Sequence, residues 1–267
     1  MDLGLQGKKA IIVGAARGIG LATAEILARE GCDLAITARS ADSVKDAVAE
    51  LKRYGGNVVG KACNVKNADE YKEWLQWAVA ELGGCDILIP FASAGGGQGS
   101  EKYWSNAFEV DLMGPVRAVE AVLPSMVERG GGAIVLIATT SAGEAQKNPG
   151  INLVYTINEP AAAGAYNALK ASLVTYGKQL GLQHGKDKIR VNVVSPGPVE
   201  FEGGNWDMIK GTMEKFYQSQ LRQHPQGRMG TPDEIARCIV FMASPAANWC
   251  NGSHLVVDGG FTNRTHF

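Results

Sequence analysis

The chain has 267 residues, of which 45% are hydrophobic and 20% are charged, and its formal net charge at pH 7 is -1. This length and composition suit one large α/β domain with a full hydrophobic core. The near-neutral balance argues against nucleic acid or an anionic membrane as the main partner, so a small molecule is the expected ligand. The N-terminal stretch lacks a signal-peptide pattern and no apolar run approaches membrane-spanning length, which predicts a cytoplasmic protein.

Cysteine and histidine are sparse and scattered. The 5 cysteines form no CxxC pair, and the 4 histidines do not cluster. These spacings argue against both a disulfide framework and a zinc site, so we expect no metal.

Short aliphatic or β-branched runs alternate with longer segments of helical period along the whole chain. The expected strands are residues 9–14, 33–38, 57–63, 86–92, 133–138, 189–195 and 254–260. The expected helices are residues 20–31, 43–55, 69–83, 104–130, a segment around Tyr166, and 231–244. This alternation predicts a single-domain α/β fold, a Rossmann-type doubly wound parallel sheet with helices on both faces.

The least patterned segment is about residues 200–227, which follows the sixth expected strand. Ligands of open α/β sheets bind outside the carboxyl ends of the strands, so this segment is a candidate substrate lid. Its apolar side chains favour a hydrophobic substrate, or they pack on one another as a small core of the lid; both interpretations stay open. These side chains are Phe201, Trp206, Met208, Met213 and Phe216.

A glycine-rich turn joins the first strand to the first helix. Gly14, Gly18 and Gly20 stand in the stretch IIVGAARGIGLATAEILAREG. A tight turn, close approach of the backbone to a pyrophosphate, and a helix N-terminus that offers N–H groups all favour glycine here. Glycines alone are a weak signal, but the strand before and the amphipathic helix after them predict a dinucleotide site.

The end of the second strand predicts which dinucleotide is preferred. An NAD site usually offers a carboxylate to the ribose hydroxyls at this point, whereas this chain reads Thr37, Ala38, Arg39, Ser40. Arg39 can pair with a 2′-phosphate and stack on adenine, and Arg17 adds a second positive charge. We therefore predict NADP(H), with NAD(H) still possible; the alternative is that both arginines are ordinary solvated surface residues.

Tyr166 and Lys170 are four residues apart and share one face of an expected helix. A phenol has a pKa near 10, and lowering it by about three units requires roughly 4 kcal/mol. An ammonium group about 4 Å away supplies about that much at an effective dielectric constant near 20. The pair is therefore a candidate reaction centre, in which Lys170 also holds the nicotinamide ribose.

These features together resemble the short-chain dehydrogenase/reductase family over nearly the whole chain, and most closely its 3-oxoacyl reductase-like members. The stretches that carry the resemblance are the glycine turn, VDLMG, GAIVLIATTSAG, the Tyr166/Lys170 pair, RVNVVSPG and NGSHLVVDGG. The resemblance implies that hydride passes between nicotinamide and a ketone or secondary alcohol. It makes Tyr166 the general acid/base, and it implies a homodimer or homotetramer.

The remaining site residues follow from the same resemblance. The family's catalytic serine aligns with Thr139, with Thr140 or Ser141 as alternatives, and its catalytic asparagine aligns with Asp111. Beyond the glycine turn, the arginines and Lys170, further cofactor contacts are expected from Ile19, Asn64, Val65, Ala92, Pro196, Gly197 and Val199.

The chain also departs from the family pattern. Residues 90–93 read Pro-Phe-Ala-Ser where the family has Asn-Asn-Ala-Gly, and Phe201 stands where a threonine often contacts the carboxamide. The connection 143–165 is long and contains a rival base, Tyr155, but Glu159 four residues later would raise rather than lower the pKa of that phenol. Asn152 and Asn158 in this connection are candidates for the substrate pocket.

The departures leave a second reading open. A catalytically silent NADP(H)-binding sensor or structural partner would tolerate the changed residues 90–93, Asp111 and Phe201. An epimerase or dehydratase on the same fold fits less well, because the chain is too short for a separate substrate domain.

Overall fold

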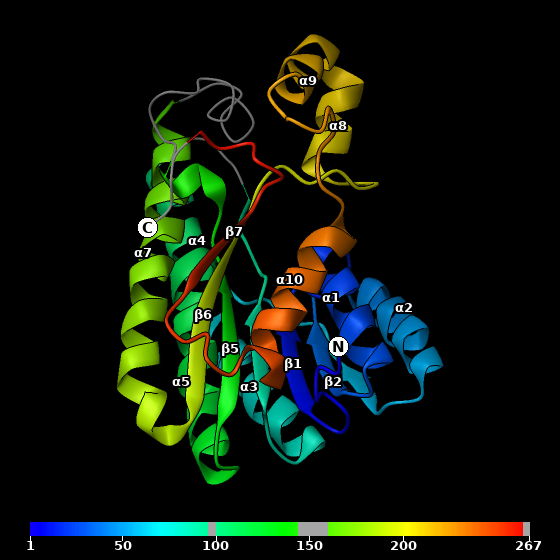
Figure 1. Ribbon diagram of the computed structural model, residues 1–267, viewed down its shortest axis with the longest axis vertical. Coiled ribbons are helices and arrows are strands. Elements are labelled where there is room, and N and C mark those ends of the chain that lie inside the picture. The colour runs from blue at the N-terminus through cyan, green and yellow to red at the C-terminus, as the bar shows by residue number, and fades with distance from the viewer. Residues whose placement is uncertain (96–99, 144–159, 264–267) are drawn as a thin grey trace.

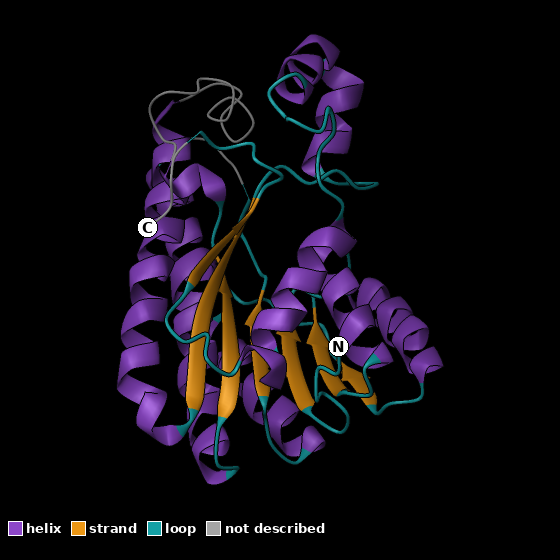
Figure 2. Ribbon diagram, viewed as in Figure 1, coloured by secondary structure: helices purple, strands orange, loops and turns teal. Residues whose placement is uncertain are grey.

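The computed structural model describes residues 1–95, 100–143 and 160–263. Within them, seven parallel strands form one sheet in the order β3-β2-β1-β4-β5-β6-β7, with helices on both sides (Figures 1 and 2). The strand order reverses between β1 and β4, so the predicted Rossmann-type doubly wound fold is confirmed. The strands are β1 (Lys9–Val13), β2 (Asp33–Thr37), β3 (Val58–Gly60), β4 (Ile87–Pro90), β5 (Gly132–Ile137), β6 (Ile189–Pro196) and β7 (His254–Val257).

Each face of the sheet has its own core. On β1, Ala10 and Ile12 belong to a cluster with α1 (Gly18–Arg29), α2 (Ala41–Leu51) and α10 (Pro232–Ala243). The alternate residues Ile11 and Val13 belong to a second cluster with α3 (Ala68–Leu82), α5 (Gly114–Glu128) and α7 (Pro160–His184). Side chains of a strand alternate between faces, so continuous apolar strands are buried on both sides.

Shorter elements complete the described chain. The remaining helices are α4 (Glu101–Ala107), α8 (Asn205–Thr212) and α9 (Glu214–Leu221). The 3-10 turns are η1 (Lys52–Tyr54), η3 (Thr140–Gly143), η4 (Gly185–Asp187) and η5 (Pro245–Ala247). Among the residues described, we find no helix with both the length and the apolar character needed to span a bilayer.

The structure divides the helix predicted over residues 104–130. A π-helical segment, η2 (Phe108–Met113), separates α4 from α5. Pro115 has no N–H to give to the Asp111 carbonyl, so a regular α-helical hydrogen bond cannot form there. Gly114 lets the helix approach the chain after β3, because an added Cβ would lie 2.8 Å from Val65 Cγ1. A π-segment inside a helix often marks a functional site, and this one carries Asp111.

Residues 200–227 include α8 and α9, which lie beyond the helices that cover the sheet (Figure 1). Trp206, Ile209, Tyr217 and Met229 form a small buried cluster there, with Met213 and Phe216 packed against it. Met208 is 53% exposed. Most apolar side chains of the segment therefore pack on one another, while Phe201 and Trp206 also line a cavity.

Candidate active site

One large cavity lies over the carboxyl ends of the strands. Its volume is about 1110 Å³, and its walls include Val13, Thr37, Ile137 and Pro196, which end β1, β2, β5 and β6. The structure places all of the predicted cofactor contacts and three of the four predicted catalytic residues along it. These are Gly14, Arg17, Gly18, Ile19, Gly20, Arg39, Asn64, Val65, Ala92, Pro196, Gly197, Val199, Thr139, Tyr166 and Lys170.

The glycine turn has the shape that its sequence predicts. Gly14 and Gly18 have φ values of +87° and +56°, a region that side chains with a Cβ rarely adopt. An added Cβ on Gly20 would lie 2.2 Å from the Gly14 carbonyl oxygen, so the first helical turn packs directly on the strand end. These glycines form a bare backbone cradle at the start of α1.

The N-terminus of α1 has no side-chain cap, unlike that of several other helices. Its N-cap residue, Arg17, makes no capping side-chain hydrogen bond, and the first turn contains no acidic residue. By contrast, α10 has a capping box in which Thr231 and Glu234 satisfy each other's backbone N–H groups. The unused N–H groups and the positive end of the α1 dipole suit an anionic group such as a diphosphate.

The charge of the cavity wall also suits a polyanionic cofactor. Among the described residues that line it, the charged side chains are Arg17, Arg39, Lys66 and Lys170, and none is a carboxylate. Arg39 is exposed at the rim and has no ion-pair partner within the described part of the chain. The cradle, the uncapped helix end and this charge pattern together fit a nicotinamide dinucleotide.

Helix α7 presents Tyr166 and Lys170 to the cavity. Both residues are nearly buried, with exposures of 8% and 2%, and Lys170 Nζ lies 5.8 Å from the centroid of the Tyr166 ring. Lys170 Nζ also donates a hydrogen bond of 3.1 Å to the Ile137 carbonyl. The ammonium is therefore held between the end of β5 and the Tyr166 ring.

Asp111 does not line the cavity. It is fully buried behind Lys170, with Oδ1 3.3 Å from Lys170 Nζ. Its Oδ2 accepts a hydrogen bond of 3.1 Å from the Ala94 N–H. The carboxylate thus connects the ammonium to the chain after β4, and its side chain acts on the site through Lys170.

The three hydroxyls after β5 differ in their hydrogen bonds. Thr140 donates to the Pro196 carbonyl at 3.3 Å, and Ser141 donates to Asn167 Oδ1 at 2.8 Å. Thr139 Oγ1 lies 3.1 Å from Ser141 Oγ. Because Ser141 gives its hydrogen to Asn167, Thr139 is the donor in that contact and can redirect its hydrogen to a ligand. Thr139 is the best placed of the three to polarise a carbonyl.

The altered loop after β4 still closes on the glycine turn. Phe91 N–H donates to the Val13 carbonyl at 2.7 Å, and an added Cβ on Gly14 would lie 3.0 Å from Ala92 N. The backbone therefore approaches the turn closely although the family's glycine is absent. Gly14, which has no Cβ, makes this close approach possible from the side of the glycine turn.

Some cavity residues, among them Lys66 and Asn106, had no assigned role in the sequence analysis. The Phe201 ring, which stands where a threonine of the family often contacts the carboxamide, lies against Gly18, where an added Cβ would be 2.6 Å from Phe201 Cζ. Lys66 directly follows Asn64 and Val65, two predicted cofactor contacts, so its position in the sequence could have indicated it. Asn106 lies in an expected helix whose sequence pattern gave no such indication. Asn152, Tyr155 and Asn158 lie outside the described residues.

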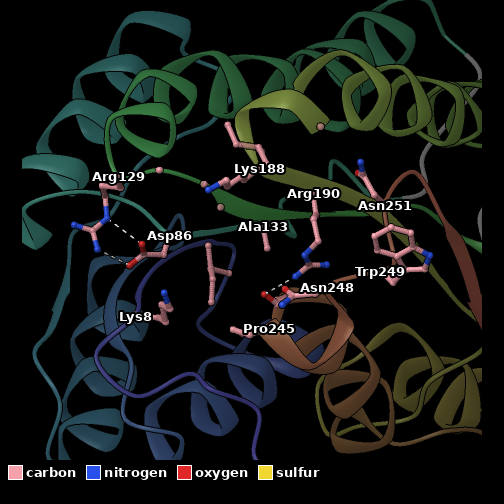
Figure 3. Close-up of a pocket in the computed structure, with 17 residues that line it drawn as sticks. Lys8, Asp86, Arg129, Ala133, Lys188, Arg190, Pro245, Asn248, Trp249 and Asn251 are labelled. Atoms are coloured by element: carbon pink, nitrogen blue, oxygen red, sulfur yellow. Dashed lines mark hydrogen bonds and ion pairs between the residues drawn. The ribbon is translucent and has the colours of Figure 1, made fainter.

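A second hollow, of about 680 Å³, lies at the amino ends of β4, β5 and β6 (Figure 3). Its acidic side chain, Asp86, is paired with Arg129 through two contacts of 2.9 Å. Arg190 donates to the carbonyls of Met242, Ala243, Ser244 and Cys250. These groups tie secondary-structure ends together, and the hollow contains neither the glycine cradle nor the tyrosine.

Comparison with known proteins agrees with this geometry. A family model described as enoyl-(acyl carrier protein) reductase matches residues 14–262. The chain is also similar to dehydrogenase/reductase SDR family member 4 of Oryctolagus cuniculus, at 32% identity over 97% of this chain and 95% of the relative. The chain belongs to the short-chain dehydrogenase/reductase family. It is accordingly an NAD(P)-dependent oxidoreductase that acts on alcohol or carbonyl groups.

Solved structures of this family superpose on the whole chain. L-sorbose reductase from Gluconobacter frateurii, complexed with NADPH and L-sorbose, matches with a TM-score of 0.86 and 31% identity over 99% of this chain and 100% of that one. A 7α-hydroxysteroid dehydrogenase, complexed with NADH and 7-oxo glycochenodeoxycholic acid, matches with a TM-score of 0.84 and 28% identity over 99% and 98%. These neighbours support a nicotinamide cofactor and a small-molecule substrate. The two neighbours bind different cofactors and different substrates.

Proposed function

We propose that this enzyme is an NADP(H)-dependent ketone reductase or secondary alcohol dehydrogenase in which Tyr166 is the general acid/base. The observation that carries the proposal is the placement of Tyr166, Lys170 and Thr139 on the same cavity as the glycine turn. The finer resemblance to 3-oxoacyl reductases remains a prediction.

The placement of the side chains on the cavity supports the proposed roles. Bound reduced nicotinamide supplies the hydride that the carbonyl carbon accepts. The Tyr166 phenol gives its proton to the carbonyl oxygen, and the Lys170 ammonium stabilises the phenolate that remains. Thr139 donates a hydrogen bond to the same oxygen as its negative charge develops. In the reverse direction the phenolate removes the hydroxyl proton.

The preference for NADP(H) over NAD(H) rests on Arg39. Its guanidinium is exposed at the cavity rim after β2, where the described lining offers no carboxylate to ribose hydroxyls. A guanidinium can make two charge-assisted hydrogen bonds to a 2′-phosphate. Arg17 and Lys66 add positive charge for the rest of the dinucleotide.

The proposed substrate is a mainly apolar ketone or secondary alcohol. Trp206 and Phe261 line the cavity together with Val110, and Asn106 supplies a polar contact. We propose further that the chain forms one domain with residues 200–227 as a substrate lid. A homodimer or homotetramer is also proposed, from the family resemblance.

The test is a calorimetric titration of wild-type protein and Arg39→Ala with NADPH and with NADH. NADPH affinity should fall at least tenfold in the variant while NADH affinity stays within a factor of two. Arg53→Ala, at another exposed arginine, is the matched control. Equal binding of both cofactors by wild-type protein would contradict the NADP(H) preference.

Turnover is tested separately with Tyr166→Phe. L-sorbose and 7-oxo glycochenodeoxycholic acid are the first probe ketones, because structural neighbours bind them. The variant should bind NADPH as wild type does and reduce no probe that wild type reduces. Unchanged reduction by the variant would exclude Tyr166 as the acid.

A further inference from the structure

The Phe201 side chain lies directly against the start of α1. An added Cβ on Gly18 would be 2.6 Å from Phe201 Cζ and 3.0 Å from both Cε atoms. Arg17 Nη1 donates a hydrogen bond of 3.3 Å to the Gly203 carbonyl on the same side. Residues 201–203 thus contact the second glycine of the turn and the N-cap residue of the helix.

The contacting segment is anchored at its base. Gly230 N–H donates to the Pro198 carbonyl at 3.0 Å, and Glu200 N–H donates to the Gly230 carbonyl at 3.0 Å. Beyond this anchor the chain turns at Gly203, which has a φ of +71°, and enters α8 after Gly204. Residues 202–204 join Phe201 to α8, and the first turn of α8 carries Trp206, which packs with Ile209, Tyr217 and Met229 in a small buried cluster.

A diphosphate bound at the glycine turn needs the space close to the Gly18 backbone and the N–H groups of α1. An aromatic ring in van der Waals contact with Gly18 competes for that space. We propose that Phe201 is a positioning residue that closes the glycine turn in the free enzyme, and that dinucleotide binding displaces its ring and moves the lid with it. This inference rests on the proposed cofactor function.

The displacement has a consequence for affinity. Part of the binding free energy of the dinucleotide is used to separate Phe201 from Gly18, and the apparent affinity of the wild-type enzyme is reduced by that amount. Removing the ring should therefore strengthen binding of NADPH. An ordinary contact between Phe201 and bound cofactor predicts the opposite sign.

The first experiment is calorimetric titration of full-length wild type and Phe201→Ala with NADPH. We expect a Kd at least threefold lower in the variant. Adenosine 2′-monophosphate lacks the diphosphate, and its affinity should be the same for both proteins. Phe216→Ala is the matched control: Phe216 stacks on Trp206 within the lid, at a centroid distance of 6.2 Å, so its loss loosens the lid without uncovering the turn.

The second experiment measures amide hydrogen exchange of the wild-type enzyme with and without NADPH. Gly204 N–H bonds to the Phe201 carbonyl and Gly203 N–H to Asp207 Oδ2, both at 2.9 Å. If Phe201 leaves the turn, these two amides should exchange faster when NADPH is bound, while residues 14–20 become protected.

The outcomes separate the two proposals. Unchanged or weaker NADPH binding by Phe201→Ala, or an equal gain in Phe216→Ala, would overturn the displacement. Protection of residues 14–20 without faster exchange at Gly203 and Gly204 would also overturn it and leave the cofactor function standing. If neither wild type nor any variant bound NADPH or NADH, the proposed cofactor function itself would be overturned.

Discussion

Lys170 Nζ lies 3.3 Å from Asp111 Oδ1, and the two side chains are 3% and 0% exposed. The pair is therefore a buried ion pair next to the candidate reaction centre. Such a pair adds little net stability, because desolvation of both charges offsets their attraction, but removing one partner leaves a buried charge without compensation. Its value here is that it fixes the position of the ammonium beside Tyr166.

Asp111→Leu should lower the free energy of unfolding by about 3–5 kcal/mol, the usual cost of leaving one buried charge unpaired. Lys170→Met should have a similar cost. The double variant should lose clearly less than the sum, because neither charge then remains. Urea denaturation of the four proteins gives the coupling energy, and Asp46→Asn, at an exposed carboxylate of α2, is the control. Additive losses would show that the two side chains do not interact.

Thr139→Val should reduce kcat by about 10²-fold, because one hydrogen-bond donor to the developing oxyanion is lost. Thr139→Ser keeps the hydroxyl and should recover most of the rate. Ser141→Ala removes a neighbouring hydroxyl that is bonded to Asn167 and should have a smaller effect. The measurement is steady-state reduction of a probe ketone with NADPH in excess. A larger loss in Ser141→Ala than in Thr139→Val would transfer the role to Ser141.

Gly20→Ala should distort the glycine turn. The new Cβ would lie 2.2 Å from the Gly14 carbonyl oxygen, a backbone atom that cannot move aside without shifting the turn. NADPH affinity should fall at least tenfold and the melting temperature should drop. Gly211→Ala in α8 meets no atom within 4 Å and should leave both nearly unchanged. The measurements are calorimetric titration and thermal denaturation; a native melting temperature in Gly20→Ala would refute the packing argument.

Buried thiols should make the free energy of unfolding fall at alkaline pH, and Cys32 and Cys63 are two of the three buried thiols in the described part of the chain. Burial raises the pKa of Cys32 and of Cys63 to about 12, helped by nearby acidic groups. An unfolded thiol loses its proton near pH 8.5, so each thiol's contribution is complete below that pH and is lost as pH rises toward 12. At pH 10 the loss is about 2 kcal/mol for Cys32. It is smaller for Cys63, because that thiol lines the cavity and its charge is partly screened by solvent.

Urea denaturation at pH 8 and pH 10 measures this loss. In a Cys32→Ala/Cys63→Ala variant the fall in unfolding free energy between the two pH values should be smaller by about 2–3 kcal/mol, with most of the difference from Cys32. Cys238→Ala, at a less buried thiol, should change the fall much less. An identical fall in wild type and double variant would show that these thiols do not govern the pH dependence.

The sequence alone determined the sheet, the glycine turn and the main members of the site. Apolar runs such as that of β1, with segments of helical period between them, predict strands buried on both faces of the sheet. The structure confirms this fold. The spacing of Gly14, Gly18 and Gly20 predicted a turn that only residues without a Cβ can form. Tyr166 and Lys170 share a helix face by their spacing, and both line the cavity as expected.

Only the tertiary structure decided how the departures from the family pattern are accommodated. The burial of Asp111 behind Lys170 depends on the π-helical segment, and hydrophobic periodicity does not report a local widening of a helix. The contact of Phe201 with Gly18 joins residues 183 positions apart in the chain, and no local pattern encodes it. Local sequence patterns therefore predicted the candidate site residues. Long-range packing decided which of them line the cavity and which, like Asp111, lie behind it.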